Sequence, residues 1–452
     1  MPGNSNYRQP DFLDGSDHKP IHRIRCAVHG FIHYSSAERL IIDHWIFRRL
    51  RYIRQLALTE LIYPGASHTR FEHSLGVMEM ATRIFDRLAE DNGAQMEEVF
   101  QGVEVLREAP IARARQACRL AALLHDTGHS CFSHAAESVF HEGSDHESLT
   151  VSILKTPELL GDLLNNHYFE GCAELTASLI KPAPGEIPQV QILRDIVSGQ
   201  VDADRSDYLL RDSHHCGVDY GRFDHRRLIE CLTGWQDEGS GELVIGIKRD
   251  GIHSFESLIL ARYQMNTQVY YHRLRRIYDY YLEQFFRSLD QSRFDSPEKV
   301  LEWNDIKAMQ ELFSAAADQA LPDHKWADRI VNRRHHRDVL SLDEGDGPQA
   351  VRRAGKVLEK IKEEFPDIDF IGDLPDQPFS IHKIARDDDR DGKLIDFPLL
   401  DRERKTSLGE RSQILKALPP TFRVGYIFAD VDNKQKRDEI ANRCRVLRNE
   451  FS

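Results

Sequence analysis

Apolar residues recur at helical spacing through most of the first 290 residues. Between Arg70 and Asp91 they lie on one side of a predicted helix: Leu75, Met78, Ala81, Ile84, Phe85 and Leu88. A continuous apolar string at 120–124 indicates another helix, from Ile111 to His125, that is buried on most sides. The same reading of the sequence predicts further helices at Glu147–Leu154, Gly171–Ile180, Ile192–Asp212 and Ser254–Leu289.

A few short strands are expected around these helices. They lie at Ile21–His33, Glu242–Lys248 and Phe422–Ala429. Residues Ser35–Leu58 are predicted to form a helix, because Ser-Ser-Ala-Glu at its start resembles a capping box. After Asp290, polar and charged loops alternate with short elements. We therefore expect a mainly α protein, with a polar leader at 1–20, a helical core with small β ribbons at 21–290, and a smaller mixed α/β appendage at 291–452 packed on the core.

The charge balance narrows the range of partners. The 452 residues contain 60 Lys and Arg against 73 Asp and Glu, a formal net charge of −13. A general duplex-binding protein has the opposite sign, so nucleic acid is not expected as the main partner, and any polyanion must meet a local cationic pocket. No apolar run approaches the length of a membrane span, and Met1–Pro20 is polar, so no membrane association and no secretory signal are expected. Seven scattered cysteines without a CxxC pair predict reduced thiols and a cytoplasmic location.

The most informative stretch for chemistry contains His125, Asp126 and His129. A carboxylate at the end of a buried helix is costly unless something positive neutralises it, and a divalent metal does so. His73 and Asp204 stand at helix-compatible places that would complete a site. Two His and two Asp suit Mn, Fe, Ni, Zn or Co better than a thiolate site would, with Mg a further candidate. Such a set leaves coordination positions open for water and substrate, as a hydrolytic metal requires.

The order His73, His125-Asp126, Asp204 resembles the H…HD…D signature of the HD-domain phosphohydrolase superfamily. Three longer segments, 64–77, 125–134 and 207–215, are similar to the branch that hydrolyses deoxynucleoside triphosphates (dNTPs). That branch includes the animal sterile-alpha-motif and HD-domain enzyme and bacterial dGTPase-like proteins. The resemblance covers roughly residues 20–290. It implies an HD-domain helical core, a dNTP substrate, deoxynucleoside and inorganic triphosphate as products, activation by a nucleotide, and a homodimer or homotetramer.

The resemblance also implies roles for individual residues. The catalytic metal would be held by His73, His125, Asp126 and Asp204, and the resemblance allows an additional Mg ion with the triphosphate. The residues implied in proton transfer around the leaving group are His129, His134, His146 and Glu147. Those implied in substrate binding are Gln55, Leu56, Arg70, Arg205, Tyr208, Asp212, Tyr270 and Arg273, with Tyr270 stacked on the sugar where a 2′-hydroxyl would not fit. An activator site would use Asp43, Arg48 and Arg51, although Arg48 stands where the animal enzyme has Gln.

The sequence therefore predicts a metal-dependent dNTP triphosphohydrolase. Two alternatives stay open: an HD phosphohydrolase that acts on a nucleoside monophosphate, a cyclic dinucleotide or an alarmone, and a nucleotide-sensing or single-strand-binding regulator with little turnover. Release of inorganic triphosphate belongs to the first hypothesis alone. The complete ligand set argues against the regulator, because a pure binder would not need all four groups.

Overall fold

The computed structural model describes residues 20–133, 145–182, 188–236, 242–342, 345–375, 378–382, 397–401 and 404–451. Helices account for most of these residues and the strands form small sheets, which confirms the predicted mainly α fold. In the part of the chain that is described, no helix combines the length and the apolar character that crossing a bilayer requires.

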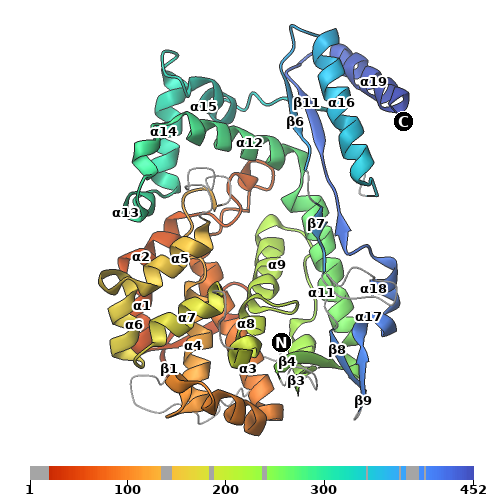
Figure 1. Ribbon diagram of the computed structural model, residues 1–452. Coiled ribbons are helices and arrows are strands. Elements are labelled where there is room, and N and C mark those ends of the chain that lie inside the picture. Colours follow the sequence, from red (N-terminus) through yellow and green to blue (C-terminus); the bar gives the residue numbers. More distant parts are fainter. Residues whose placement is uncertain are drawn as a thin grey trace.

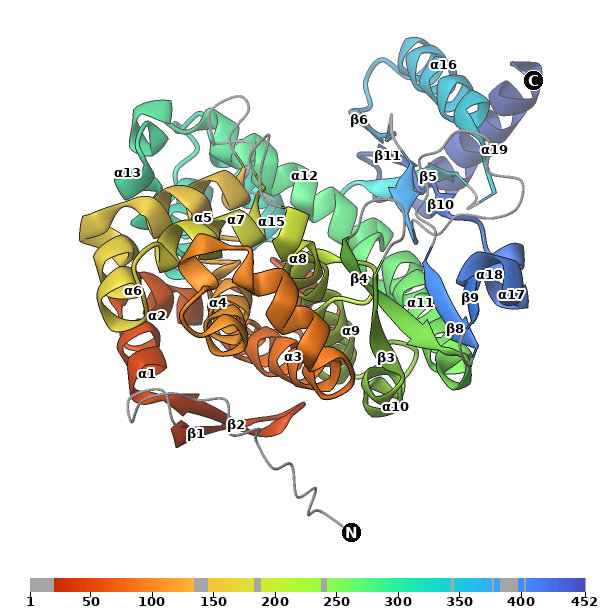
Figure 2. The same ribbon diagram turned by 60° about the horizontal axis from the view of Figure 1, so that its bottom comes forward.

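The helical core is centred on the long helices α3 (Arg70–Gln101) and α4 (Pro110–Leu124), which pack side by side (Figures 1 and 2). Shorter helices surround this pair: α1 (Ser36–Ile42), α2 (Trp45–Arg49), α5 (His146–Lys155), α6 (Asp162–His167), α7 (Cys172–Ile180), α8 (Gln191–Ser198), α9 (Ala203–Cys216), α10 (His225–Glu230), α11 (Ile252–Met265) and α12 (Arg273–Ser288). As the apolar string at 120–124 predicts, every residue of that string is fully buried.

Three further helices follow the core along the chain. They are α13 (Pro297–Leu301), α14 (Asp305–Ala317) and α15 (His324–Val331), and α15 packs on α12. Their buried side chains, such as Leu301, Leu312 and Ile330, belong to the same apolar cluster as the core helices. This packing continues the helical core past the predicted boundary near residue 290.

Small sheets tie distant parts of the chain together. β1 (Pro20–Cys26) and β2 (Gly30–Ser35) form an antiparallel hairpin, as predicted for this stretch. A four-stranded sheet contains β3 (Leu232–Gln236), β4 (Leu243–Lys248), β8 (Pro398–Asp401) and β9 (Arg404–Ser407), in the order β3-β4-β8-β9. In this sheet the late strand β8 runs parallel to β4, which joins the C-terminal part to the core. The remaining short elements are β7 (Phe379–Ser380), which pairs with β10 (Thr421–Phe422), and the helices α17 (Leu408–Arg411) and α18 (Gln413–Ala417).

Five elements form what we call the C-terminal unit: β5 (Arg337–Ser341), α16 (Pro348–Glu364), β6 (Phe370–Asp373), β11 (Tyr426–Ala429) and α19 (Lys434–Glu450). Its sheet has the order β5-β11-β6 with antiparallel neighbours, so β5 and β6 are parallel with β11 between them. This is a split β-α-β arrangement. The helices α16 and α19 pack on each other and enclose a second apolar cluster with the sheet, separate from the core cluster (Figure 2).

The predicted helix at 35–58 is shorter than expected. Its start is confirmed, because Ser35 Oγ accepts from the Glu38 N–H at 3.1 Å and Glu38 Oε2 accepts from the Ser35 N–H at 2.7 Å. However, α1 ends at the cap residue Asp43, and only α2 and one 3-10 turn follow before Ala57 adopts a left-handed φ of 47°. The apolar residues of this stretch are buried by tertiary packing rather than by one regular helix.

Two other predicted helices are each divided in two. The stretch 192–212 contains α8 and α9, and Asp202 leaves the helical path to cap α9 by accepting from the Arg205 N–H at 2.7 Å. The stretch 254–289 contains α11 and α12, separated by a π-helical turn at 266–270 and by His272, which caps α12. Apolar spacing continues across both breaks, so the periodicity alone does not reveal them.

Candidate metal centre and substrate cavity

The candidate metal centre lies where three helices meet. His73 stands on the first turn of α3, and Asp204 stands on the first turn of α9. His125 and Asp126 follow directly after α4. The three helices therefore bring together side chains that are separated by up to 131 positions in the sequence.

Close packing of α3 on α9 depends on the glycine at position 76. A Cβ built on Gly76 would lie 2.0 Å from Asp207 Oδ1 and 2.2 Å from Arg211 Nη2. Any larger side chain there would push α9, and with it Asp204, away from His73.

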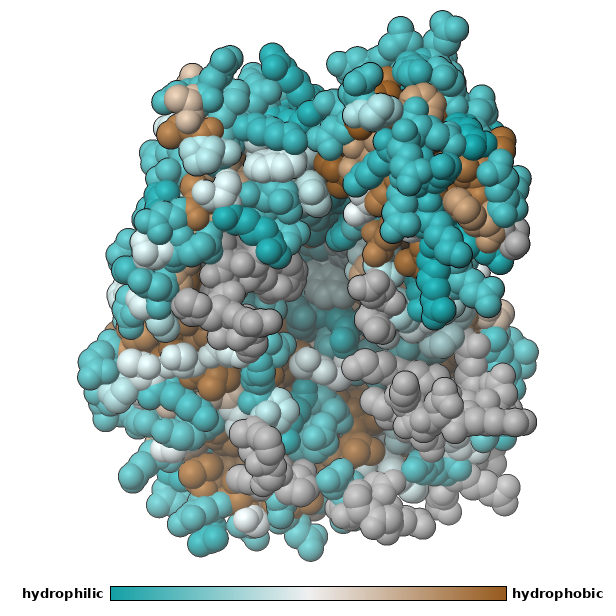
Figure 3. Space-filling model, turned by 45° about the horizontal axis from the view of Figure 1, so that its top comes forward, coloured by the Kyte–Doolittle hydropathy of each residue, from teal (hydrophilic) through white to brown (hydrophobic). Residues whose placement is uncertain are grey.

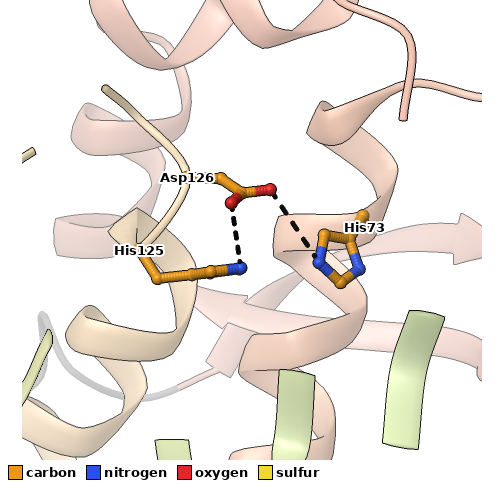
Figure 4. Close-up of side chains that lie close together, drawn as sticks. All are labelled: His73, His125 and Asp126. Atoms are coloured by element: carbon orange, nitrogen blue, oxygen red, sulfur yellow. Dashed lines mark ion pairs between the residues drawn. The ribbon is translucent and has the colours of Figure 1, made fainter. Parts of the chain in front are cut away.

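Four side chains converge at this point. The potential ligand atoms of His73, His125 and Asp126 all lie within 4.8 Å of one another (Figure 4). Asp126 Oδ1 lies 3.3 Å from His125 Nε2, and Asp126 Oδ2 lies 3.8 Å from His73 Nε2. Asp204 Oδ1 lies 3.0 Å from His73 Nε2 and 3.6 Å from His125 Nε2. The arrangement offers two imidazole nitrogens and two carboxylates to one ion.

Hydrogen bonds turn both imidazoles so that Nε2 faces the centre. Nδ1 of His73 lies 2.8 Å from Asp207 Oδ2, and Nδ1 of His125 lies 2.8 Å from the carbonyl oxygen of Ala122. When each Nδ1–H donates to its oxygen, Nε2 carries the free lone pair. Nε2 of His125 is buried and has no hydrogen-bond partner among the described residues. A buried unpaired acceptor beside two carboxylates fits a divalent metal ion.

Asp207 stabilises the centre by holding Nδ1 of His73, the ring nitrogen that faces away from it. Its carboxylate is buried and interacts with the side chains of His73, His29 (2.5 Å) and Arg211 (2.8 Å to both Nε and Nη2). Burial alone would raise the pKa of Asp207, but Arg211 and the two histidines outweigh it and hold the pKa well below its ordinary value. Asp207 therefore stays ionised and fixes the His73 ring, as carboxylates behind metal-binding histidines do.

The charges at the centre are strongly coupled. Burial opposes protonation of His73, but its hydrogen bonds to Asp204 and Asp207 outweigh burial and raise its pKa to about 10. Burial also opposes ionisation of Asp126, yet Arg70, whose Nη1 lies 2.6 Å from Asp126 Oδ2, holds the pKa of that carboxyl well below its ordinary value. Without metal, His73 therefore carries a proton, which a divalent ion has to displace.

A stacked histidine pair borders the centre. The rings of His129 and His146 lie 3.8 Å apart, and His129 Nε2 lies 3.4 Å from Asp126 Oδ1. Burial, together with the positive charge of Arg70 and the neighbouring His146, holds the pKa of His129 well below its ordinary value. The pair can stack because residue 128 is glycine, where a Cβ would lie 2.1 Å from the His146 carbonyl oxygen.

A cavity of about 560 Å³ opens beside the metal centre, a size common for small-molecule sites. It is lined by the four candidate metal ligands and by Gln55, Leu56, Arg70, His129, His146, Glu147, Arg205, Tyr208, Asp212 and Tyr270. In the view of Figure 3 the surface is hollowed near its centre, and hydrophilic residues predominate around the hollow. Most of the residues that the resemblance implies for catalysis and substrate binding thus share one space.

The helix α9 contributes several residues to one wall of the cavity. Asp204, Tyr208 and Asp212 follow one another at intervals of four residues, so they share a helix face and span roughly 12 Å along the axis. At the far end, Asp212 Oδ2 accepts a hydrogen bond of 2.7 Å from the Tyr270 hydroxyl, and Asp212 Oδ1 lies 2.7 Å from His68 Nε2. The metal centre and this Asp–Tyr pair therefore lie at opposite ends of one wall.

Arg273 is not part of this assembly. Arg273 does not line the cavity, and its Nη1 lies 2.5 Å from Asp338 Oδ1 on β5. His134 lies outside the described residues, so its predicted role is not tested.

The three residues predicted for an activator site lie elsewhere. Asp43, Arg48 and Arg51 are exposed around the end of α1 and the short helix α2. Asp43 pairs with Arg39 at 3.3 Å, and the guanidinium of Arg51 lies 3.5 Å above the Phe71 ring. None of the three lines the cavity beside the candidate metal ligands, and their predicted role stays a prediction.

Several residues of the site are not expected from the sequence. Arg275, Arg276 and Asp279 of α12 line the cavity, and Asp207 holds His73. Asp207 begins the segment 207–215 of the resemblance and lies three residues after Asp204, almost one helical turn on, but the sequence alone assigns it no role. Nothing in the sequence indicates that the α12 side chains reach the cavity, because the break at His272 decides which way α12 turns.

Comparison with known proteins agrees with this geometry. The family described as the HD domain matches residues 70–211, and the family described as the HD associated region matches residues 223–368. Uncharacterized protein YwfO of Bacillus subtilis is 37% identical over 263 residues, which are 55% of this chain and 51% of YwfO. The deoxynucleoside triphosphate triphosphohydrolase SAMHD1 homolog of Dictyostelium discoideum is 30% identical over 288 residues, which are 62% of this chain and 51% of that protein.

Among solved structures, the crystal structure of a hypothetical protein from Aquifex aeolicus is similar to this chain with a TM-score of 0.73 and 27% identity. The match covers 93% of this chain and 99% of that one. The chain spans about half the length of the first curated relatives it matches, which include YwfO.

Proposed function

Because this chain belongs to the HD-domain phosphohydrolases, we propose that it is a metal-dependent dNTP triphosphohydrolase, which converts a dNTP and water to a deoxynucleoside and inorganic triphosphate. The observation that carries the proposal is the composition of one cavity. Metal-capable side chains, arginines and the hydrogen-bonded pair Asp212–Tyr270 line the same space of about 560 Å³. The relative named as a dNTP triphosphohydrolase supports the substrate class.

Arginines supply the contacts for a triphosphate. Among the described residues, Arg70, Arg205, Arg275 and Arg276 line the cavity. Charge-assisted hydrogen bonds from guanidinium groups to phosphate oxygens are strong and directional. Arg70 is already held by Asp126 at 2.6 Å and by Ser133 Oγ at 2.8 Å, so it loses little conformational freedom when phosphate binds. We assign Arg70 and Arg205, which lie nearest the metal ligands in sequence, to the phosphates.

His73, His125, Asp126 and Asp204 would hold the ion. A divalent ion bound there would supply Lewis-acid polarisation of a phosphoryl oxygen and a water of lowered pKa. His129 is neutral in the ligand-free protein because its pKa is held low, so its ring is able to accept the proton that the attacking water loses as its oxygen bonds to the α-phosphorus. The negative charge of a bound triphosphate favours the protonated imidazole, which then donates to the departing 5′-oxygen. His146 stacks on His129, and Glu147 follows it on α5, so both belong to the same proton-handling group.

The far end of the cavity suits a deoxyribose. Asp212 is buried and fixed by both Tyr270 and His68, and its carboxylate is placed to accept from a 3′-hydroxyl. Tyr270 meets the edge of Tyr208 at 5.9 Å between ring centres, which restrains both rings. We assign the exclusion of ribonucleotides to the Tyr270 ring, together with Gln55 and Leu56 on the facing wall.

Nucleotide activation and assembly into a homodimer or homotetramer form a second part of the proposal, supported by the resemblance to the animal enzyme. The exposed residues Asp43, Arg48 and Arg51 would contact the activator. If this is right, a mixture of dNTPs is cleaved faster than any single dNTP, and the activating nucleotide increases the mass measured by light scattering.

The decisive experiment is turnover of each dNTP and NTP with Mn or Mg, alone and in mixtures, with the products resolved by chromatography. The proposal predicts deoxynucleoside and inorganic triphosphate from dNTPs and little product from NTPs. Release of orthophosphate or pyrophosphate would favour another nucleotide hydrolase. Raised melting temperatures with dNTPs but no products would favour a nucleotide-binding regulator.

A variant pair tests the assignment of Tyr270. Tyr270→Ala should raise the NTP/dNTP ratio of kcat/KM, because it opens the wall beside the sugar. Tyr280→Ala is the matched control: Tyr280 belongs to the same aromatic stripe but packs on Trp326 and does not line the cavity. An unchanged ratio in Tyr270→Ala would remove Tyr270 from sugar selection without affecting the assignment of the reaction.

A further inference from the structure

The segment that follows the candidate metal ligands His125 and Asp126 has an unusual backbone. We call residues 127–133 the active-site loop. In it, Phe132 has a φ of 53° and Ser133 a φ of 56°, so two successive residues lie in the left-handed region. Non-glycine residues rarely adopt this conformation, and a bulky side chain such as Phe does so only where the surroundings enforce it. Both side chains are buried. Something in the structure must therefore hold this turn.

Asp305, the first residue of α14, makes the contacts that hold it. The Asp305 side chain is buried, and its Oδ1 accepts from the Phe132 N–H at 2.7 Å. Its Oδ2 accepts from the Arg54 N–H at 2.9 Å. The residue after Arg54 is Gln55, which lines the cavity. One carboxylate therefore joins two backbone segments that border the substrate cavity.

The backbone turn that Asp305 holds also orients the Arg70 side chain. Ser133 Oγ donates to the Arg54 carbonyl oxygen at 2.8 Å and accepts from Arg70 Nε at 2.8 Å. Arg70 Nη1 then reaches Asp126 Oδ2 at 2.6 Å. A chain of direct hydrogen bonds and one turn of backbone thus connects Asp305 with a candidate metal ligand.

The other side of the loop is held by Arg49. Its Nη1 and Nη2 donate to the His129 carbonyl oxygen at 2.7 and 2.6 Å. Burial lowers the pKa of Arg49 to about 10, and the negative charge of Asp305 works against that shift. The loop is therefore held between a buried guanidinium and a buried carboxylate.

Docking of α14 on the core does not require this carboxylate. The face of α14 that meets the core already buries Ala308, Leu312 and Ala315 almost completely. A buried carboxylate costs free energy unless its oxygens are well bonded, and burial raises the pKa of Asp305 to about 6. A charged side chain at this position is therefore better explained by the loop it bonds than by the packing of its own helix.

We propose that Asp305 is a positioning residue for the active-site loop 127–133, and that through Ser133 it sets the direction in which Arg70 meets Asp126 and the substrate. The proposal rests on the function proposed above. Asp305 lies in the HD associated region, outside the HD domain match, so this region contributes directly to the geometry of the site.

Steady-state kinetics of four proteins test the proposal: wild type, Asp305→Asn, Asp305→Ala and Leu312→Ala. Asp305→Asn keeps the shape but leaves one of the two N–H groups without an acceptor. A displacement of about 1 Å in an active-site group costs on the order of 100-fold in rate. We expect kcat to fall by about that factor in Asp305→Asn and Asp305→Ala, with KM changed much less. Leu312→Ala weakens α14 docking and lowers the melting temperature, but at a temperature where it is folded kcat should stay near that of wild type.

Hydrogen exchange of the Phe132 and Arg54 amides gives a readout that needs no substrate. Both should exchange faster in Asp305→Asn than in Leu312→Ala. Equal loss of kcat in Asp305→Asn and Leu312→Ala, or unchanged exchange at Phe132, would overturn the positioning role. If wild type cleaves no dNTP, the proposed function fails, and the exchange experiment still decides whether Asp305 holds the loop.

Discussion

Charged side chains occupy different places in the helical core and in the C-terminal unit. In the core, ion pairs such as Asp86–Arg115, Glu38–Arg119 and Asp207–Arg211 have side chains that are at most 7% exposed. Among the described residues of the C-terminal unit, the buried side chains are apolar or belong to Cys444, and the Glu364–Arg443 pair lies on its surface.

This difference distinguishes side chains that stabilise the fold from side chains that serve the chemistry of the site. An apolar interior such as that of the C-terminal unit stabilises a fold without further requirements. Buried charges cost desolvation free energy and are weak contributors to stability, so their concentration around α3, α4 and α9 needs another reason. The network fixes the direction of the His73 ring and keeps Asp126 ionised, and a metal ion requires both. The high energetic cost of these buried charges therefore supports placing the proposed function in the core.

The largest stability effect should come from breaking a buried pair. Asp86 and Arg115 share two hydrogen bonds of 2.6 and 2.9 Å inside the core. Asp86→Ala leaves a buried guanidinium unpaired and should destabilise the protein by about 3–5 kcal/mol. Glu364→Ala breaks a pair with equally short bonds at the surface of the C-terminal unit and should leave the melting temperature nearly unchanged. Thermal unfolding of both variants measures the contrast, and equal shifts would refute it.

Asp126→Asn should have the largest effect on activity. It removes a candidate ligand and the charge partner of Arg70. Loss of a group behind a metal ligand costs about 10–100-fold, and loss of the ligand itself should exceed that, so turnover should fall by more than about 100-fold. The control is Asp346→Asn, which breaks a pair with Arg448 in the C-terminal part and should preserve turnover. Persisting activity and bound metal in Asp126→Asn, measured by elemental analysis, would contradict the ligand assignment.

Asp207→Asn should weaken metal binding by about 10–100-fold, because His73 loses the acceptor that fixes its ring. Titration calorimetry with Mn measures the affinity. The melting temperature should fall as well, since Arg211 loses both of its short bonds to Asp207. An unchanged metal affinity would show that Asp207 has a purely structural role.

The smallest effect is a dependence of metal affinity on pH. The pKa of His73 is raised from 6.5 to about 10 in the metal-free protein, so His73 contributes stability that is complete below pH 6.5 and is lost as the pH rises toward 10. Metal affinity has the opposite trend, because the ion displaces this proton. It should rise by up to about tenfold per pH unit between these limits. Calorimetry in buffers of different ionisation enthalpy measures the released proton, and a pH-independent affinity would contradict the coupling.

Much of the site can be predicted from the sequence. His125 and Asp126 are adjacent and end a strongly apolar helix, so their chemistry is visible without a structure. The prediction that His73 and Asp204 are ligands rests on the longer H…HD…D order of the resemblance, because the sequence places Asp204 inside one expected helix at 192–212. Elements with strong local signals, such as α4 and the capped start of α1, are likewise found from the sequence.

Other features depend on long-range contacts that no local pattern reveals. The breaks at Asp202 and His272 follow continuous apolar spacing, yet they set the directions of α9 and α12. The stretch 35–58 fails as a single helix because tertiary packing satisfies its apolar residues in another way. Asp305 lies 173 positions from Phe132, and only the folded chain brings them into contact.

By itself, the sequence determined the helical class, the buried helix that carries His125 and Asp126, and the types of side chain available to a metal ion. Tertiary structure decided which of those side chains meet, that Arg273 pairs with Asp338 instead of lining the cavity, and that Asp207 and Asp305 hold the site from behind. The physical reason is the distance along the chain over which each kind of interaction acts. Periodicity and capping act within a few residues, whereas the direction and charge state of a buried group depend on neighbours that the fold brings from elsewhere in the chain.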